Sequence, residues 1–403
     1  MLFVAFVAHA TVQVMCRSVR RARPRFHAGT LLRGAAAACE PGTGQTRGAL
    51  AHGPPPASAP SRPRALVASI ALVALSAGPA RAGCDAAALR FERLGPQLWL
   101  LRAHAAESTP ANGGFTSNLV LARDGARTWL VGSGPTPAFG ARVACAVRER
   151  FGVAVTDVID PWPHPELVMG NAAFDGARLW AAAPVAEAMR TQCARCVARL
   201  RERIGVAGDG LDERAVRVPA ALPQDAPGRG TIGPWRWQVV ARGTDAPATL
   251  LRHAPSNVAL AHGLLWVGAA PDLRDASLAS MREATRTLRR AARRDGVARW
   301  VGEQGPPGDV GDLERQQRYW HALQRALDAA IAAGRDDAAR PVALPGLARG
   351  DVARHALNWQ RGWREREQRW LDAQRARDGR GADGAAGVPA PRAPESRGEP
   401  TRR

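Results

Sequence analysis

Hydrophobic and polar residues recur along this chain with two periods, which predict both strands and helices. Apolar and polar residues alternate over 94–101, and an apolar run at 153–159 is typical of a buried strand. Further strands are predicted at 113–122 after a loop, and at 128–131, 235–241, 248–251, 258–261 and 264–268. Helical spacing covers 138–151, 182–204, 277–294 and, after residue 318, the chain to about 376 with a break at 341–350.

The order of these segments predicts the fold class. Strands and helices alternate through most of the chain, which is typical of an α/β protein. We predict two mixed sheets with helices on the outer faces. With 403 residues, 46% of them hydrophobic, the chain is long enough to bury a large core.

A secretory signal peptide is predicted at residues 61–82. Arg62 and Arg64 precede an apolar core at 65–77, and Ala80-Arg81-Ala82 follows as a cleavage site. The core is shorter than the ~20 residues of a membrane-spanning helix, so we expect a periplasmic or secreted mature chain with no transmembrane span. Cys84 lies just past the cleavage site, as a disulfide partner or a lipidated residue.

The predicted signal peptide sets the remaining boundaries. Residues 1–60 are interpreted as a disordered leader or an over-extended translation start, because a signal peptide belongs at the N-terminus. We predict one domain at 83–376 and a disordered tail at 377–403, which is rich in Gly, Pro and Arg.

The positive charge does not indicate a nucleic-acid-binding protein. The formal net charge is +20, and all 56 basic residues are arginine. Residues 1–82 alone contribute +9, since they hold ten arginines and one acid. The other arginines are dispersed among Asp and Glu on predicted helices, with no basic block interleaved by aromatic residues. We therefore expect no nucleic-acid partner.

The segment 162–171, Trp-Pro-His-Pro-Glu-Leu-Val-Met-Gly-Asn, is the strongest candidate for a functional site. It follows the buried run at 153–159 and precedes 172–174, so it lies where a buried strand ends and a helix begins, a position where catalytic ligands are often placed. His164 and Glu166 are residue types that bind metal ions. The pattern predicts a cleft at the end of this strand.

This segment resembles the His-x-His-x-Asp-His signature of the metallo-β-lactamase superfamily, with Trp162, His164, Glu166 and Leu167 at the four ligand positions. Segments 112–118, 129–134, 252–258, 265–269 and 302–306 resemble further motifs of the family in the expected order. The likeness is strongest to the quinoprotein relay system zinc metallohydrolases of the bacterial periplasm. It implies an αββα sandwich, a zinc hydrolase and a quinoprotein or cytochrome partner.

The resemblance also implies where the other zinc ligands would lie. His253 falls on the Gly-His-Thr motif, Ala269 on the bridging aspartate and Gln304 on the last histidine, while Gly132 replaces another customary aspartate. Most ligand positions are thus substituted. A hydrolytic zinc site needs three protein ligands and an open fourth position, so a dinuclear centre is not expected.

Two functional hypotheses follow. In the favoured one, the protein is a degenerate relative, with no metal cofactor, that binds a small molecule or a protein partner in a vestigial cleft. That cleft would contain Trp162, His164, Glu166 and His253. In the alternative, His164, His253 and Glu166 hold one zinc ion in an active mononuclear hydrolase linked to quinoprotein dehydrogenases.

Cys193 and Cys196 form a second candidate site. They lie three residues apart within a predicted helix, so they share one face. In an oxidising compartment such a pair can form a disulfide, serve as a redox motif or pack as two apolar side chains. The sequence favours a structural disulfide or a packed pair, because a strand leading into a helix N-terminus is missing here.

Overall fold

The computed structural model describes residues 89–243, 246–335, 338 and 340–385, without the side chains of Ala194 and 377–385. The predicted leader at 1–60, the signal peptide at 61–82 and Cys84 lie outside the described residues, as does the tail from 386. None of the helices in these ranges has the length and apolar content needed to cross a bilayer.

The strands of the described chain form two mixed sheets. The first sheet runs in the order β1 (Phe91–Gly95), β2 (Leu98–Leu101), β3 (Leu119–Asp124), β4 (Arg127–Val131), β5 (Asp157–Asp160), β6 (Arg178–Ala181) and β7 (Ala220–Ala221). The second runs in the order β12 (Arg299–Gly302), β11 (Val258–Ala261), β10 (Pro247–His253), β9 (Trp235–Ala241) and β8 (Arg229–Ile232). Each sheet contains both parallel and antiparallel pairs.

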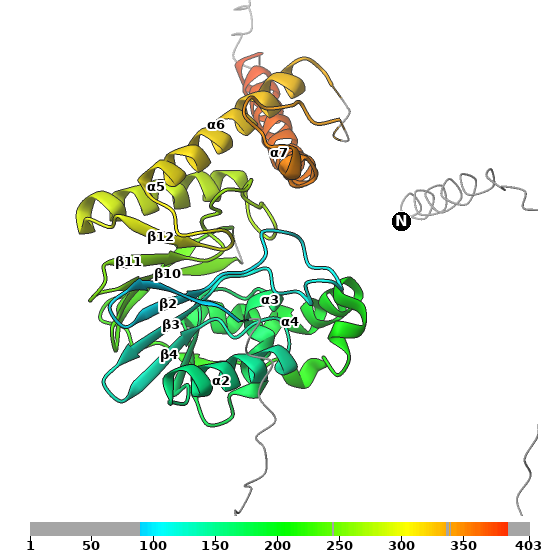
Figure 1. Cartoon of the computed structure of the whole chain (residues 1–403). Coiled ribbons are helices and arrows are strands. Elements are labelled where there is room, and N and C mark those ends of the chain that lie inside the picture. The colour runs from blue at the N-terminus through cyan, green and yellow to red at the C-terminus, as the bar shows by residue number, and fades with distance from the viewer. Residues whose placement is uncertain (1–88, 244–245, 336–337, 339, 386–403) are drawn as a thin grey trace, which may run out of the picture. The chain divides into compact units, whose positions relative to one another are not determined.

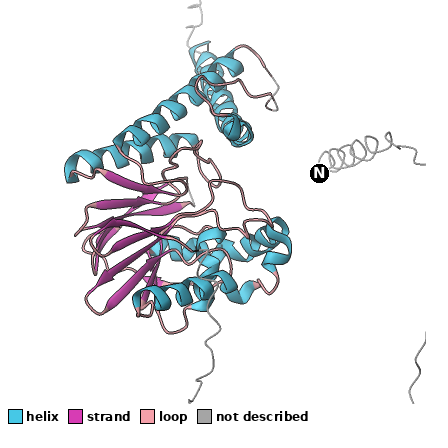
Figure 2. Cartoon of the chain, in the orientation of Figure 1, coloured by secondary structure: helices cyan, strands magenta, loops and turns pink. Residues whose placement is uncertain are grey.

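Helices cover the outer faces of the two sheets. The α-helices are α2 (Pro137–Phe151), α3 (Pro165–Val168), α4 (Ala183–Ile204), α5 (Leu278–Asp295), α6 (Val310–Ala332) and α7 (Val352–Ala385). Short 3-10 helices are η2 (Met169–Ala173), η3 (Gly205–Gly208), η4 (Glu213–Ala215) and η5 (Arg349–Asp351). Figure 1 shows α2 below the first sheet and α5 above the second, and Figure 2 shows the strands stacked between them. The predicted αββα sandwich is confirmed.

Two hydrophobic clusters hold these layers. The larger lies between and around the sheets and includes Leu100, Leu121, Trp129 and Trp300, all of which are fully buried. The smaller joins α5, α6 and α7 through residues such as Trp320. Burial of such apolar side chains, rather than any bound ion, supplies the main free energy of this architecture.

Three predicted segments differ from the structure. The alternation at 94–101 is a hairpin rather than one strand, because the chain turns at Pro96 and Gln97, where Gln97 has φ of 54°. Residues 264–268 form no strand. The chain instead leaves β11 through α5 and returns as β12, parallel to β11, and such a parallel return requires a long crossover.

The third difference concerns the end of the chain. The predicted disordered tail starts at 377, but α7 continues to Ala385. The first turns of α7 are anchored by the fully buried Trp359.

Candidate functional site

The predicted cleft segment connects β5 to α3. His164 occupies the N-cap of α3, and Pro165 follows at the first helical position, where proline is favoured. The imidazole of His164 stacks on the indole of Trp162, with 4.3 Å between the ring centroids and 10° between the planes. The stack holds the His164 ring in one orientation, with only 8% of the residue exposed.

Glu303 connects this segment to two other parts of the chain. Its carboxylate accepts hydrogen bonds from Trp162 Nε1 at 2.9 Å, from the backbone N–H of Gly263 at 2.8 Å and from the Ser117 hydroxyl. It directly follows β12, and only 3% of it is exposed. Glu303 is therefore the buried anion at which the ends of both sheets meet.

Glu166 is the second buried carboxylate. Its Oε2 lies 3.2 Å from His164 Nδ1, without hydrogen-bond geometry, and its Oε1 accepts a hydrogen bond of 2.8 Å from the Ser108 hydroxyl. Burial by itself would raise the pKa of Glu166, but interactions with His164, Arg274 and the Ser108 hydroxyl outweigh it and lower that pKa. The carboxylate is thus held in its ionised form.

Arg274 occupies the other side of His164. Its Nη1 lies 3.2 Å from His164 Nε2, and its Nη2 donates to Glu107 at 2.9 Å. A guanidinium can only donate, so Nε2 is the acceptor and the imidazole proton is assigned to Nδ1, facing Glu166. The lone pair through which His164 would bind a metal is engaged by an arginine.

Arg242 is a buried cation at the end of β9. It is 1% exposed, donates to the backbone oxygens of Gly263 at 2.6 Å and Arg274 at 3.0 Å, and lies over the Trp162 ring. Burial lowers the pKa of Arg242 to about 10. No carboxylate of the described chain forms an ion pair with Arg242, so its charge is compensated only at longer range.

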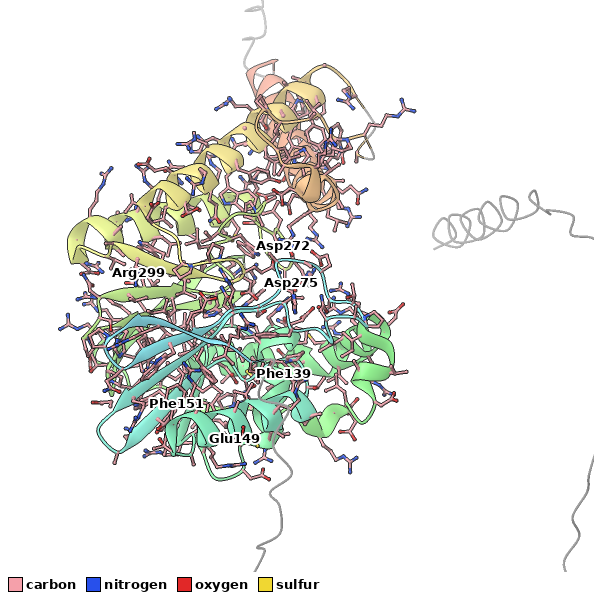
Figure 3. The ribbon with its side chains drawn as sticks, in the orientation of Figure 1. Phe139, Glu149, Phe151, Asp272, Asp275 and Arg299 are labelled. Atoms are coloured by element: carbon pink, nitrogen blue, oxygen red, sulfur yellow. The ribbon has the colours of Figure 1, made fainter. Side chains whose placement is uncertain are left out.

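These residues surround a small cavity of about 40 Å³. Its walls come from the β5–α3 segment, from α4 and from the loop that leads to α5. Figure 3 labels Asp272 and Asp275 in that loop, between the two sheets and α7. The charged residues that line the cavity are Arg199, Arg203, Arg242, Arg274, Glu166 and Asp275.

His253 does not join the site that the resemblance implies. It ends β10, packs against Trp235 and interacts electrostatically with Asp124. Asp124 is the last residue of β3. Asn118 lies just before the first residue of β3 and donates its backbone N–H to Glu303 O, so the site is at the opposite end of this strand. The ends of β3 are roughly 17 Å apart, while two ligands of one zinc ion lie within about 4 Å. The structure therefore does not bring His253 together with His164 and Glu166, the three residues of the mononuclear hypothesis.

The substituted positions each have a structural explanation. Leu167 is fully buried and packs beside Gly132, where an added Cβ would lie 2.4 Å from the Leu167 Cδ1 atom. Gln304 lies at the rim, where its Nε2 donates to Ala106 O and its Oε1 accepts from Arg354. Ala269 lines a different hollow of about 920 Å³ beside α6.

Zinc, the ion that the resemblance implies, does not fit these residues. Of the implied ligands, only His164 and Glu166 lie together, and Arg274 donates to the free nitrogen of His164. Within the described ranges, no three His, Cys, Asp or Glu side chains are grouped so that they could hold a metal ion. Two guanidinium groups in contact with this segment supply positive charge next to Glu166 and Glu303.

Cys193 and Cys196 are free, buried thiols that hydrogen-bond to each other on α4. Neighbouring side chains three apart on a helix have Cβ atoms about 5–6 Å apart, but a disulfide needs about 3.8 Å. The predicted disulfide would therefore require α4 to distort, and the structure shows the packed thiol pair instead. Cys196 lines the cavity.

Several site residues were not found from the sequence. Glu303 is adjacent to Gln304 and directly follows an apolar strand. This position at a strand end is the sequence feature that could have indicated a site residue. Arg242 likewise ends a strand, and Arg274 is in an acidic loop segment. His262 Nε2 donates a 2.7 Å hydrogen bond to Asn118 O beside Glu303, although its sequence context gave no indication of a site.

Comparisons with known proteins return metallo-β-lactamases. No protein-family model and no curated protein matches the chain. The metallo-β-lactamase FIM-1 of Pseudomonas aeruginosa, in a mono-zinc form, is 16% identical, with a TM-score of 0.44 over 58% of this chain and 95% of that one. A metallo-β-lactamase of Erythrobacter litoralis is 19% identical, with a TM-score of 0.44 over 58% and 96%. Scores of this size do not bear on the chemistry of this chain, and the two-sheet architecture rests on the strand pairing described above.

Proposed function

We propose that this protein binds a small anionic group, such as a carboxylate or phosphate, in the cavity beside His164, without a metal ion. The single observation that carries the proposal is Arg242, a buried guanidinium on the cavity wall with no carboxylate partner in the described chain. Arg242 donates to two backbone oxygens but makes no ion pair within the described residues, and an anion in the cavity would supply one.

The balance of charge around the cavity supports an anionic ligand. Four arginines line it against two carboxylates, Glu166 and Asp275. Glu166 is already engaged by His164, Arg274 and Arg203, the last at 3.6 Å. Positive charge therefore remains in excess where a ligand would enter.

The volume of the cavity limits the ligand. Sites for drug-sized molecules measure about 300–1,000 Å³, whereas this cavity has about 40 Å³. A space well below that range favours a small ionic group and leaves the rest of a larger ligand outside.

The residues do not support hydrolysis by a metal-bound hydroxide. That chemistry requires three protein ligands and an open position, and here Arg274 donates to His164 Nε2. The quinoprotein relay system, a periplasmic location and a quinoprotein or cytochrome partner stay predictions from sequence resemblance. A ligand bound at this cavity is compatible with such a setting.

Isothermal titration with inorganic phosphate, sulfate and acetate tests the proposal. We expect saturable binding that weakens with salt, and a loss of about 10- to 100-fold in affinity in Arg242→Gln, from the removal of a charge-assisted contact. Arg214→Gln is the matched control, because Arg214 is exposed and pairs only with Asp212.

A second variant keeps the test decisive if Arg242→Gln does not fold. Glu166→Gln removes a competing negative charge from the cavity while Ser108 can still donate to the amide oxygen. We expect tighter anion binding in this variant. Absence of any anion binding by the wild type, or one equivalent of tightly bound zinc that is lost in His164→Ala, would refute the proposal.

A further inference from the structure

The cavity contains a nucleophile that the proposed function does not use. Cys196 lines it as a free thiol, 7% exposed, three residues after the fully buried Cys193 on α4. Arg199, one turn further along the same helix, places Nη2 3.8 Å from the Cys196 sulfur. A thiol, a second thiol and a cation thus meet at one wall of a polar cavity.

The surroundings make the two thiols unequal. Cys193 donates its hydrogen to Cys196, and burial further disfavours ionisation of Cys193. The hydrogen bond from Cys193, with the charge of Arg199 next, lowers the pKa of Cys196 to about 7, while burial and Asp275 oppose this shift. As a thiol, Cys196 instead donates to Gln192 O at 3.4 Å.

The size of the cavity selects the electrophile that can reach Cys196. A space of about 40 Å³ is far below the ~300–1,000 Å³ of sites for drug-sized molecules, so it favours a small electrophile. Hydrogen peroxide is an electrophile of this size, and it reacts with thiolates rather than with thiols.

We propose that Cys196 is a peroxide-reactive thiol that is oxidised to sulfenic acid inside this cavity. The Cys196 sulfur attacks one peroxide oxygen, so that an S–O bond forms and the O–O bond breaks. Hydroxide leaves and takes a proton from solvent to become water. The sulfur loses two electrons and the peroxide gains them.

Arg199 and Cys193 act as positioning residues in this reaction. Both donate to the sulfur and thereby favour its thiolate form. Because a Cys193–Cys196 disulfide would distort α4, the sulfenic acid persists long enough to be trapped. The inference does not depend on anion binding, since it needs only access of peroxide to the cavity.

Treatment of the full-length protein with hydrogen peroxide, followed by dimedone and peptide mass spectrometry, tests the inference. We expect a dimedone adduct on Cys196, with a pH–rate midpoint near 7, in place of the ~8.5 of a free cysteine. At pH 7 the rate should exceed that of free cysteine, because the larger thiolate fraction outweighs the loss of nucleophilicity that accompanies a lower pKa.

Variants separate this role from simple exposure. Arg199→Gln and Cys193→Ala should both raise the pH midpoint, whereas Cys193→Ser retains a hydroxyl donor and should change it less. Arg195→Gln is the control, because Arg195 is an exposed residue of the same helix that does not line the cavity. Arg195→Gln and Arg199→Gln change exposed side chains of α4 and are compatible with folding.

The outcomes are distinct from those of the proposed function. No adduct on Cys196, or a midpoint near ~8.5 that Arg199→Gln leaves unchanged, would overturn the inference. Phosphate binding that persists in Cys196→Ser while labelling is lost shows two separate properties of one cavity. Labelling of Cys196 in a protein that binds no anion would refute the proposed function alone.

Discussion

The guanidinium of Arg242 lies over the indole of Trp162, with 4.1 Å between the Arg242 Cζ atom and the ring centroid. The two residues come from the ends of different sheets, β9 and β5. Their contact, together with the Trp162–Glu303 hydrogen bond, joins the ends of the two sheets beside the cavity. The consequences of this arrangement can be measured.

Glu303→Gln should destabilise the fold more than any surface substitution. The carboxylate accepts from Ser117, Trp162 and Gly263, and a glutamine amide nitrogen would face one of these donors. We expect a loss of about 2–4 kcal/mol in the free energy of unfolding, measured by urea denaturation. Glu314→Gln, at a half-exposed position, should change it by less than about 0.5 kcal/mol. Equal losses of unfolding free energy in the two variants would show that the Glu303 hydrogen bonds do not stabilise the contact between the sheets.

Gly132→Ala should be strongly destabilising. Gly132 has φ of +74°, and a Cβ there would lie 2.4 Å from Leu167 Cδ1 and 2.8 Å from Leu119 Cδ2. Backbone strain and overpacking together predict a loss of about 2–4 kcal/mol, observed as a lower thermal midpoint. The matched control is Gly125→Ala, which has a similar φ of +57° but no neighbouring atom within 4 Å. A loss as large in the control would attribute the effect to the backbone alone.

His253→Phe should make the protein less sensitive to acid. Both ring nitrogens of His253 lack partners, and burial lowers the pKa of His253 to about 4. The unfolded state binds a proton near pH 6.5 and the folded state only near 4, so stability is full above 6.5 and falls as the pH decreases through this window. The term is at most about 3 kcal/mol.

Thermal melts of His253→Phe and wild type between pH 4 and 8 measure this term. The variant should be the more stable of the two at pH 5, and it should retain anion binding, because His253 lies at the opposite end of β3 from the site. A difference in melting temperature between the two proteins that is the same at every pH would contradict the buried, neutral state of His253.

Asp160→Asn should remove a loss of stability at alkaline pH. Asp160 is fully buried, accepts one hydrogen bond from Asn171 at 2.6 Å, and has a pKa that burial raises to about 8. The folded state keeps its proton up to about 8, whereas the unfolded state releases it near ~3.9. Stability therefore falls as the pH rises through this window.

The melting temperatures of Asp160→Asn and wild type should coincide near pH 4 and diverge in favour of the variant towards pH 8. The contribution of His253 is common to both proteins and cancels in the difference. A variant that is less stable than wild type at pH 8 would show that the Asp160 carboxylate, rather than the neutral acid, is the form that the fold requires.

The sequence by itself determined the layered architecture and one part of the site. Periodic apolar residues predict elements such as β9, β11, α4 and α5, because burial on one face of a strand or helix leaves a regular pattern. The cleft segment with Trp162, His164 and Glu166 also lies where predicted, since all three follow one buried strand and are close in sequence.

Only the tertiary structure decided what completes the site. Arg242, Arg274 and Glu303 come from three different connections and meet Trp162 and His164 through strand pairing over long sequence separations. A motif match assigned His253 to this cluster, but sheet register places it at the other end of β10. Local pattern reports which face of an element is buried, whereas register and crossover connections fix which ends of the strands meet.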